Sequence, residues 1–228
     1  MSARHGKADS MVTTAGVHGG VHGTRTNRLA RILKNPFVGM SPWIVFSLVM
    51  GPWGFETAVG LALALSVCLT VAGHRVSPGT SLKILEVAAI VLFATLAIVG
   101  ALAGPGTLRW LQDHAGEVTS WAFVAVAFGS MAVGTPFTLQ YAREMVDKQY
   151  WNSPAFTRTN YVITGVWGLV FLIDAASRAY GSLVLHDPDN MWTSWIIPLA
   201  AIIGAVRFTL WYPDHVRARA RAAGPVRP

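Results

Sequence analysis

Long apolar stretches alternate with short polar segments from residue 36 to residue 212. A membrane-spanning helix needs about 20 apolar residues, because the hydrocarbon core of a bilayer is about 30 Å thick. Six stretches approach this length, and the segments between them are too short for a separate soluble domain. The six predicted spans cover residues 36–50, 55–72, 82–103, 119–140, 160–179 and 191–212. The pattern therefore predicts an all-α polytopic membrane protein with a six-helix transmembrane domain at 36–212.

The first stretch is the shortest, and Gly51-Pro52-Trp53-Gly54 predicts a tight turn directly after it. A re-entrant or interfacial segment at 37–50 is the alternative to a full crossing. The basic residues distinguish the two, since six crossings place 15 of the 18 Lys and Arg residues on one side, and five crossings destroy this alternation. Basic segments stay in the cytoplasm. We therefore expect both termini to be cytoplasmic.

The two ends of the chain differ from the transmembrane domain. Residues 1–25 are rich in Gly, His, Thr and Ser without periodicity, which predicts a disordered tail. In residues 26–35 apolar positions line one helical face with basic residues around them, which predicts a juxtamembrane amphipathic helix on an anionic leaflet. Residues 213–228 are expected to form a basic cytoplasmic tail.

Composition supports the membrane class. Hydrophobic residues make up 53% of the chain and charged residues 13%, against roughly 25% charged in soluble domains. The net charge of +7 comes from basic residues that flank the spans, so it predicts a phospholipid membrane as partner and no nucleic acid. The single Cys68 excludes a disulfide within one chain.

Small residues recur at four-residue spacing within the predicted spans. This spacing lets helix backbones approach closely in lipid and predicts tight packing. The pairs are Gly60/Ala64, Gly100/Gly104, Thr164/Gly168 and Ala200/Gly204.

Polar side chains gather where the fourth predicted span meets the cytoplasm. Pro136 lacks a backbone donor and is expected to kink the helix after Gly134. The side chains that follow would then lie near the inner headgroups and could bind a lipid headgroup or a partner helix; the alternative is an ordinary kinked helix end. The candidate contact residues are Pro136, Thr138, Gln140, Arg143, Glu144, Trp151 and Asn160.

Further expectations concern the ends of the spans. Asn160 or Thr159 is expected to cap the fifth span. Trp43 is expected to anchor the bundle at the inner interface, as interfacial tryptophans do. Asp174 and Arg178 lie four residues apart in the fifth span, a spacing that predicts an intramembrane ion pair.

The chain has none of the motifs that would identify a hydrolase, a metalloprotease or a nucleotide-binding protein. No paired histidines occur within the spans to ligate haem. We therefore predict no enzymatic activity, no cofactor and no metal site. An enzyme that acts on lipid headgroups through Arg143, Glu144 and Asp147 is a weaker alternative, because these residues include no clear pair of base and nucleophile.

The order of elements resembles that of the intracellular septation protein A family of small bacterial inner-membrane proteins. The likeness rests on Pro42-Trp43-Ile44-Val45-Phe46 in a short first span, the Arg158-Thr159-Asn160 segment, Val166-Trp167-Gly168-Leu169-Val170-Phe171-Leu172 in the fifth span, and Trp192 before the last. It covers roughly residues 36–212, and the Pro136–Glu144 block departs from it. The resemblance implies a bacterial cytoplasmic-membrane location and a role in envelope or septation organisation.

The leading functional hypothesis is thus a non-catalytic inner-membrane protein that acts through helix–helix or lipid contacts. Its expected partners are phospholipid and other membrane proteins or a second copy of the chain. The alternative is a small-solute transporter or channel, as a monomer or an oligomer, with Gln140, Arg143, Asp174 and Arg178 facing its interior. The absence of a charge at mid-span weakens that alternative.

Overall fold

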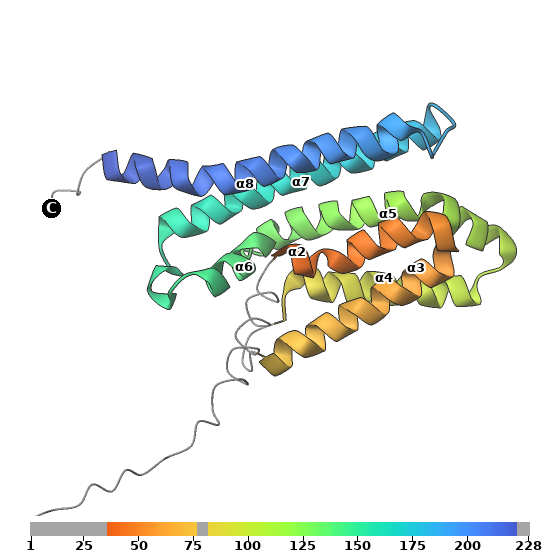
Figure 1. Ribbon diagram of the computed structural model, residues 1–228, viewed down its shortest axis with the longest axis horizontal. Coiled ribbons are helices and arrows are strands. Elements are labelled where there is room, and N and C mark those ends of the chain that lie inside the picture. The colour runs from red at the N-terminus through yellow and green to blue at the C-terminus, as the bar shows by residue number, and fades with distance from the viewer. Residues whose placement is uncertain (1–35, 77–81, 223–228) are drawn as a thin grey trace, which may run out of the picture.

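The computed structural model describes residues 36–76 and 82–222, and the described chain is helical without strands. The predicted tail at 1–25 and the predicted amphipathic helix at 26–35 lie outside these residues. Figure 1 shows the arrangement of the helices. They are α2 (Pro36–Gly39), α3 (Ser41–Val76), α4 (Ile84–Leu102), α5 (Pro105–Ala132), α6 (Phe137–Met145), η1 (Lys148–Tyr150), α7 (Pro154–Leu183), η2 (Trp192–Ile196) and α8 (Ile197–Ala222).

Five helical segments of the described chain are long and apolar enough to cross a membrane: α3, α4, α5, α7 and the continuous η2–α8 segment. The predicted class, an all-α bundle of apolar helices, is therefore confirmed. Helix α3 is interrupted at Gly54, whose φ of 80° and ψ of 173° belong to a region that only glycine adopts readily. Its two arms run antiparallel in Figure 1, so the chain passes along the bundle six times.

The helices form two layers (Figure 1). Helices α7 and α8 lie side by side in one layer, and α3, α4 and α5 form the other. Helix α7 is central, because it packs against α5 across the layers as well as against α8. Helix α6 lies at the end of the bundle where α8 ends, and it also packs against α7.

A row of aromatic rings crosses the core and joins the layers. Trp43 packs between Phe93 and Phe123, with ring centroids 5.3 and 4.0 Å away. Phe123 stacks on Phe171 at 4.6 Å, and Phe171 contacts Trp167 at 5.7 Å. Trp43 is only 2% exposed, so its predicted role as an interfacial anchor is wrong. The first arm of α3 directs this side chain toward α4 and α5, where ring contacts hold it.

Several helix boundaries differ from the predicted spans; α5, for example, ends at Ala132 and not at residue 140. Helix α5 begins at Pro105, so residues 105–118 are helix rather than loop. The charged residues of this segment made it look like a loop in the sequence. In the structure Arg109 and Asp113 are exposed on one side of the helix, while Leu111 and Ala115 pack into the core. The segment is an amphipathic extension of a span.

Helix α7 begins at Pro154 with Ser153 at the N-cap position, so the predicted cap at Asn160 or Thr159 is wrong. Proline suits the first turn of a helix, whose N–H groups have no intrahelical partner. Helix α8 continues past Tyr212 and through Pro213 to Ala222. The first part of the predicted basic tail is therefore helical.

Close helix packing is confirmed at two of the predicted small-residue pairs. A methyl group added at Gly100 would lie 2.8 Å from Phe55 Cε1, and one added at Gly168 would lie 2.9 Å from Phe128 Cζ. Gly60, Gly104 and Gly204 have nothing within 4 Å of such an added atom. These three glycines do not mediate helix contacts within the described chain.

The Gly54 turn leads to a first prediction. Gly54→Ala should lower the free energy of unfolding by about 1–3 kcal/mol, because alanine is strained at this φ and ψ. Gly51→Ala is the matched control in the same turn, since Gly51 is helical, exposed and has open space around it. The free energy of unfolding of both variants is measured from the loss of helix content, followed by circular dichroism during titration with a denaturing detergent. Equal stability of the two variants would contradict the turn geometry.

Packing at Gly100 leads to a second prediction. Gly100→Ala should destabilise the bundle by about 1–3 kcal/mol, because the buried Phe55 ring must shift to admit the methyl group. Gly60→Ala should instead be neutral or stabilising by up to about 1 kcal/mol, since alanine favours the helix and meets nothing. The unfolding midpoint of each variant, measured during titration with a denaturing detergent, should fall for Gly100→Ala and stay or rise for Gly60→Ala. A midpoint for Gly100→Ala at or above that of Gly60→Ala would contradict the close contact with Phe55.

Candidate functional site

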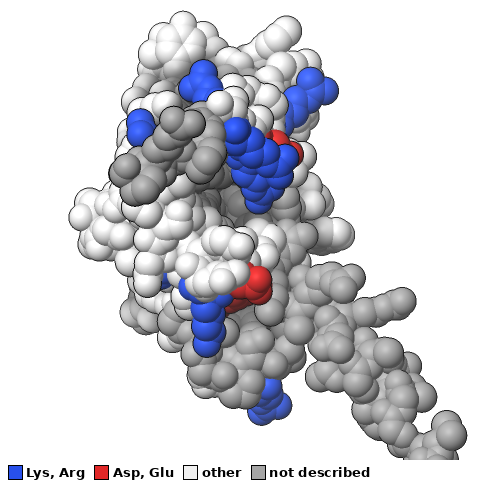
Figure 2. Space-filling model, turned by 90° about the vertical axis from the view of Figure 1, so that its left-hand side faces the viewer, with Lys and Arg blue, Asp and Glu red and all other residues white. Residues whose placement is uncertain are grey.

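One end of the bundle, which we call the basic end, carries most of the described cations. Figure 2 views this end and shows more Lys and Arg than Asp and Glu on its surface. The opposite end has Arg109 and Arg178, and Arg207 lies along α8. The basic end has Arg75, Lys83, Arg143, Lys148, Arg158, Arg217, Arg219 and Arg221.

A break between α5 and α6 shapes the basic end. The predicted kink after Gly134 is present as a full interruption: Gly134 has a φ of 80°, and α6 resumes only after Pro136. Ser130 satisfies the freed backbone donors, because its carbonyl accepts from Thr135 N at 3.0 Å and its hydroxyl accepts from Phe137 N at 3.1 Å. Helix α6 is thereby a separate helix that follows the end of α5.

One face of α6 is held to the start of α4. Gln140 Oε1 accepts a hydrogen bond from Ile84 N at 2.8 Å and so caps α4. Glu144 forms an ion pair with Lys83 at 3.3 Å, and Glu86 lies 3.8 Å from the same ammonium group. The Lys83 side chain is also 4.5 Å from the centre of the Tyr141 ring. We call Lys83, Glu86, Gln140, Tyr141 and Glu144 the α4–α6 clamp.

Tyr141 is the most buried member of the clamp, at 1% exposure. Its hydroxyl lies against the Cα of Gly39, where any side chain would collide with it. Burial raises the pKa of this hydroxyl, and the nearby carboxylates of Glu86 and Glu144 raise the pKa further. Tyr141 therefore stays protonated and acts as a packing group between α2 and α6.

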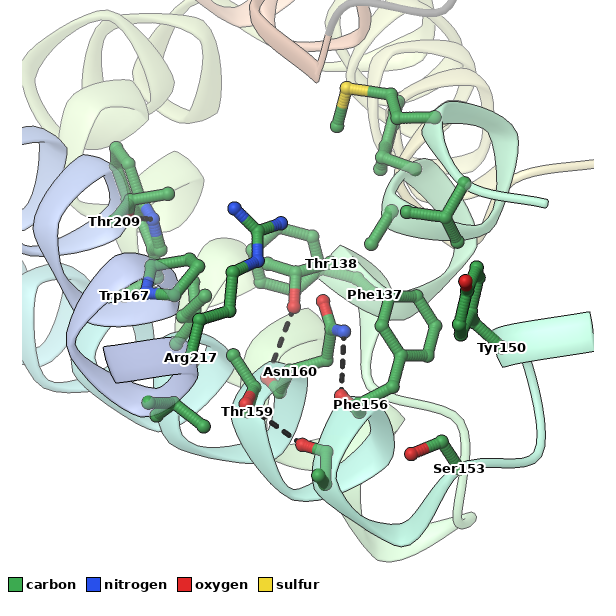
Figure 3. Close-up of a pocket in the computed structure, with 18 of the residues that line it drawn as sticks. Phe137, Thr138, Tyr150, Ser153, Phe156, Thr159, Asn160, Trp167, Thr209 and Arg217 are labelled. Atoms are coloured by element: carbon green, nitrogen blue, oxygen red, sulfur yellow. Dashed lines mark hydrogen bonds between the residues drawn. The ribbon is translucent and has the colours of Figure 1, made fainter. Parts of the chain in front are cut away.

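The other face of α6 lines a pocket of about 760 Å³, within the range of small-molecule sites. The first turns of α7, the second half of α8 and the segment 146–153 complete it, as Figure 3 shows. The buried wall includes Phe137, Tyr141, Asn160, Ile163 and Trp167. The exposed or half-exposed rim includes Asp147, Tyr150, Ser153 and Arg217. The pocket is thus apolar in depth and polar at its mouth.

Hydrogen bonds within the protein occupy most of the polar groups of the pocket wall; the buried hydroxyl of Tyr141 has no hydrogen-bond partner among the described residues. Thr138 Oγ1 donates to the carbonyl of Asn160 at 3.1 Å and lies 2.6 Å from Thr164 Oγ1. Asn160 Nδ2 donates to the carbonyl of Phe156 at 2.9 Å, one of the bonds drawn in Figure 3. Trp167 Nε1 donates to Thr209 Oγ1 at 3.0 Å. The wall therefore offers mainly hydrocarbon and ring surface.

Arg143 and Trp151 lie beside the pocket and do not line it. The Arg143 guanidinium is 5.7 Å from the centre of the Trp151 ring, and Lys148 is 5.9 Å from the same centre. Trp151 Nε1 donates to the carbonyl of Val146 at 3.3 Å. This cation–aromatic stack holds the segment 146–151 against α6.

The predicted contact residues therefore separate into groups. Thr138 and Asn160 line the pocket, Pro136 is buried behind it, Gln140 and Glu144 belong to the clamp, and Arg143 and Trp151 form the stack. Sequence reasoning missed the rest of the pocket, because it depends on long-range packing of α6, α7 and α8 and on helical extensions of α7 and α8 that were not predicted. Residues missed in this way are Tyr150, Ser153, Phe156, Trp167, Thr209 and Arg217.

The predicted ion pair in α7 is confirmed, at the opposite end of the bundle. Arg178 Nε lies 3.1 Å from Asp174 Oδ1, and Ser120 of α5 donates to the other carboxylate oxygen. Arg178 Nη2 also donates to the carbonyl of Ser194 in η2 at 3.2 Å. Every strong polar group of this cluster has a partner, and the cluster ties α5, α7 and η2 together.

Within residues 36–76 and 82–222, no three His, Cys, Asp or Glu side chains lie close enough to hold a metal ion. No protein-family model, no curated protein and no solved structure matches the chain.

The clamp leads to a third prediction. Lys83→Met should lower the free energy of unfolding by about 3 kcal/mol, because it removes a buried cation beside two poorly exposed carboxylates. Adding Glu144→Gln to that variant should recover part of the loss, since one uncompensated charge disappears. A double-mutant cycle from detergent unfolding measures this coupling.

Asp214→Asn is the control for the cycle, because it breaks the exposed ion pair with Arg217. Such pairs contribute about 0–1 kcal/mol. If Lys83→Met proved as mild as Asp214→Asn, the clamp would not hold α6 in place.

Proposed function

We propose that this chain is a non-catalytic integral protein of the bacterial cytoplasmic membrane that binds a membrane amphiphile in the pocket at its basic end. In this proposal the six passes of the described chain are six transmembrane spans, and both termini are cytoplasmic. The gathering of cations at one end supports this orientation, because basic segments are retained on the cytoplasmic side.

The polarity gradient of the pocket is the observation that carries the proposal. Its floor is apolar and buried, with Phe137, Ile163 and Trp167 among the lining residues. Its mouth is exposed and holds Asp147 and Arg217. A ligand with a hydrocarbon chain and a polar head matches both parts. A fully polar solute would instead place its polar groups against the apolar floor, where they would find few hydrogen-bond partners.

The depth of the pocket also suits a lipid of the inner leaflet. Trp167 lies in the apolar part of α7, while Arg217 lies beyond it on the extension of α8. A bound amphiphile would therefore keep its chain at the level of the bilayer and its head at the cytoplasmic surface. The Trp151 stack beside the pocket is a suitable interfacial anchor for this end.

A transporter or channel receives less support. The charged pair of α7, Asp174 and Arg178, lies toward one end of that helix. Near its middle, the aromatic contacts of Phe123, Phe171 and Trp167 fill the core, and the polar contact there, from Trp167 Nε1 to Thr209 Oγ1, is neutral. A headgroup enzyme is also disfavoured, because Glu144 pairs with Lys83 and Arg143 stacks on Trp151. The resemblance to the septation family stays a prediction, and amphiphile binding does not depend on it.

A fourth prediction tests amphiphile binding. The full chain is purified in native-lipid nanodiscs, transferred to mild detergent, and examined by native mass spectrometry. We expect lipid to be retained on the chain, because the pocket at the basic end joins an apolar floor to a polar mouth. Ala155→Trp, a change at the exposed mouth of the pocket, should reduce retention about fivefold or more by blocking entry.

Ala176→Trp is the matched control, since Ala176 is equally an exposed alanine of α7 but lies away from the pocket. Both variants should unfold at the same temperature as the parent protein. Loss of lipid from both, or from neither, would contradict binding in this pocket.

A further inference from the structure

The rim of the pocket carries opposite charges on facing sides. Figure 3 shows Arg217 reaching from α8 into the open middle of the pocket, with Tyr150 and Ser153 on the other side. Asp147 belongs to that other side, because its carbonyl accepts a hydrogen bond from Tyr150 N at 3.0 Å. The described rim thus presents one guanidinium and one carboxylate to a ligand headgroup.

Both charges are available to a ligand. Arg217 pairs with Asp214 at 3.0 Å, but the two side chains are 66% and 75% exposed, and such surface pairs are weak. Within the described chain, the Asp147 carboxylate makes no side-chain hydrogen bond or ion pair. The hydroxyls of Tyr150 and Ser153 likewise have no partner among the described residues.

We propose that the ligand is a zwitterionic phospholipid whose headgroup carries a phosphate and a primary ammonium. Arg217 binds the phosphate, Asp147 binds the ammonium, and the acyl chains lie along the wall formed by Phe137 and Trp167. This assignment rests on the proposed function and adds the class of headgroup. It follows from the charges at the rim, which neither a neutral nor a singly charged headgroup satisfies.

Other common headgroups match the rim less well. An anionic glycerol phosphate satisfies Arg217 but brings a net negative charge toward Asp147, and it offers that carboxylate only neutral hydroxyl donors. A quaternary ammonium is attracted to Asp147 but has no N–H group to donate. A primary ammonium supplies three such donors, and hydrogen bonds between charged groups are roughly twice as strong as neutral ones.

The fifth prediction uses the full-length protein and three defined lipids. The protein is equilibrated with vesicles that contain equal amounts of phosphatidylethanolamine, phosphatidylglycerol and phosphatidylcholine with identical acyl chains. Native mass spectrometry then measures the lipid retained. We expect phosphatidylethanolamine to exceed each of the others about tenfold, the effect of one charge-assisted hydrogen bond.

The two rim charges should have different signatures. Asp147→Asn should lower retention of phosphatidylethanolamine to that of phosphatidylcholine and raise retention of phosphatidylglycerol, because the repulsion of its phosphate is removed. Arg217→Gln should lower retention of all three lipids together, since all three carry the phosphate. Arg221→Gln, a nearby change on α8 outside the pocket, should alter none of them.

Equal retention of the three lipids by the parent protein would overturn the headgroup assignment and leave amphiphile binding intact. An equal loss of retention of all three lipids in Asp147→Asn would also overturn the headgroup assignment and leave amphiphile binding intact. Absence of any retained lipid would overturn both proposals. A photo-cross-linker placed at Val216 identifies the occupant directly: a cross-link to phosphatidylethanolamine supports the assignment, and one to residues 1–35 makes the chain itself the occupant and overturns it.

Discussion

The interruption of the helix between Ala132 and Phe137 determines the layout of the basic end. A continuous helix would carry α6 past the bundle, because residues 137–145 would extend along the axis of α5. Gly134 and Pro136 prevent this, and Ser130 supplies the hydrogen bonds that the turn requires. Such satisfaction matters in a membrane protein, where water is not at hand to bond a freed donor. The turn places α6 beside α7, and the pocket is the space left between them.

The nine residues of α6 serve two separate contacts through helical periodicity. Gln140 and Glu144, one turn apart, face α4 and complete the clamp. Thr138 and Ala142, also one turn apart, face the pocket. Tyr141 lies between the faces and contributes to both, since it packs under Lys83 and also lines the pocket. Apart from Tyr141, the clamp thus fixes the wall of the pocket through residues that do not line it.

Periodicity and charge predicted the apolar helices, the turn at 51–54, the kink at Gly134 and the pair Asp174–Arg178, because each depends on local sequence. Contacts between residues far apart in the sequence could not be predicted in this way, because they depend on how the helices pack. Gln140 was expected to face a lipid or partner, yet its acceptor is used by Ile84 N, 56 residues away in sequence. The pocket was missed because its mouth combines Asp147 with Arg217, and only the unexpected helical extension of α8 brings Arg217 there.

The bilayer itself limits what the pocket wall can contribute to selectivity. In water, burying an acyl chain against Trp167 and Phe137 would be strongly favourable. In a membrane the chain leaves other hydrocarbon, so the wall gains packing contacts and little hydrophobic free energy. In the proposed complex, discrimination between lipids that share the same chains must therefore arise at the rim, which Asp147 and Arg217 line. The exposed charges of the rim, although they add little to folding stability, are then the part of the pocket on which lipid selection depends.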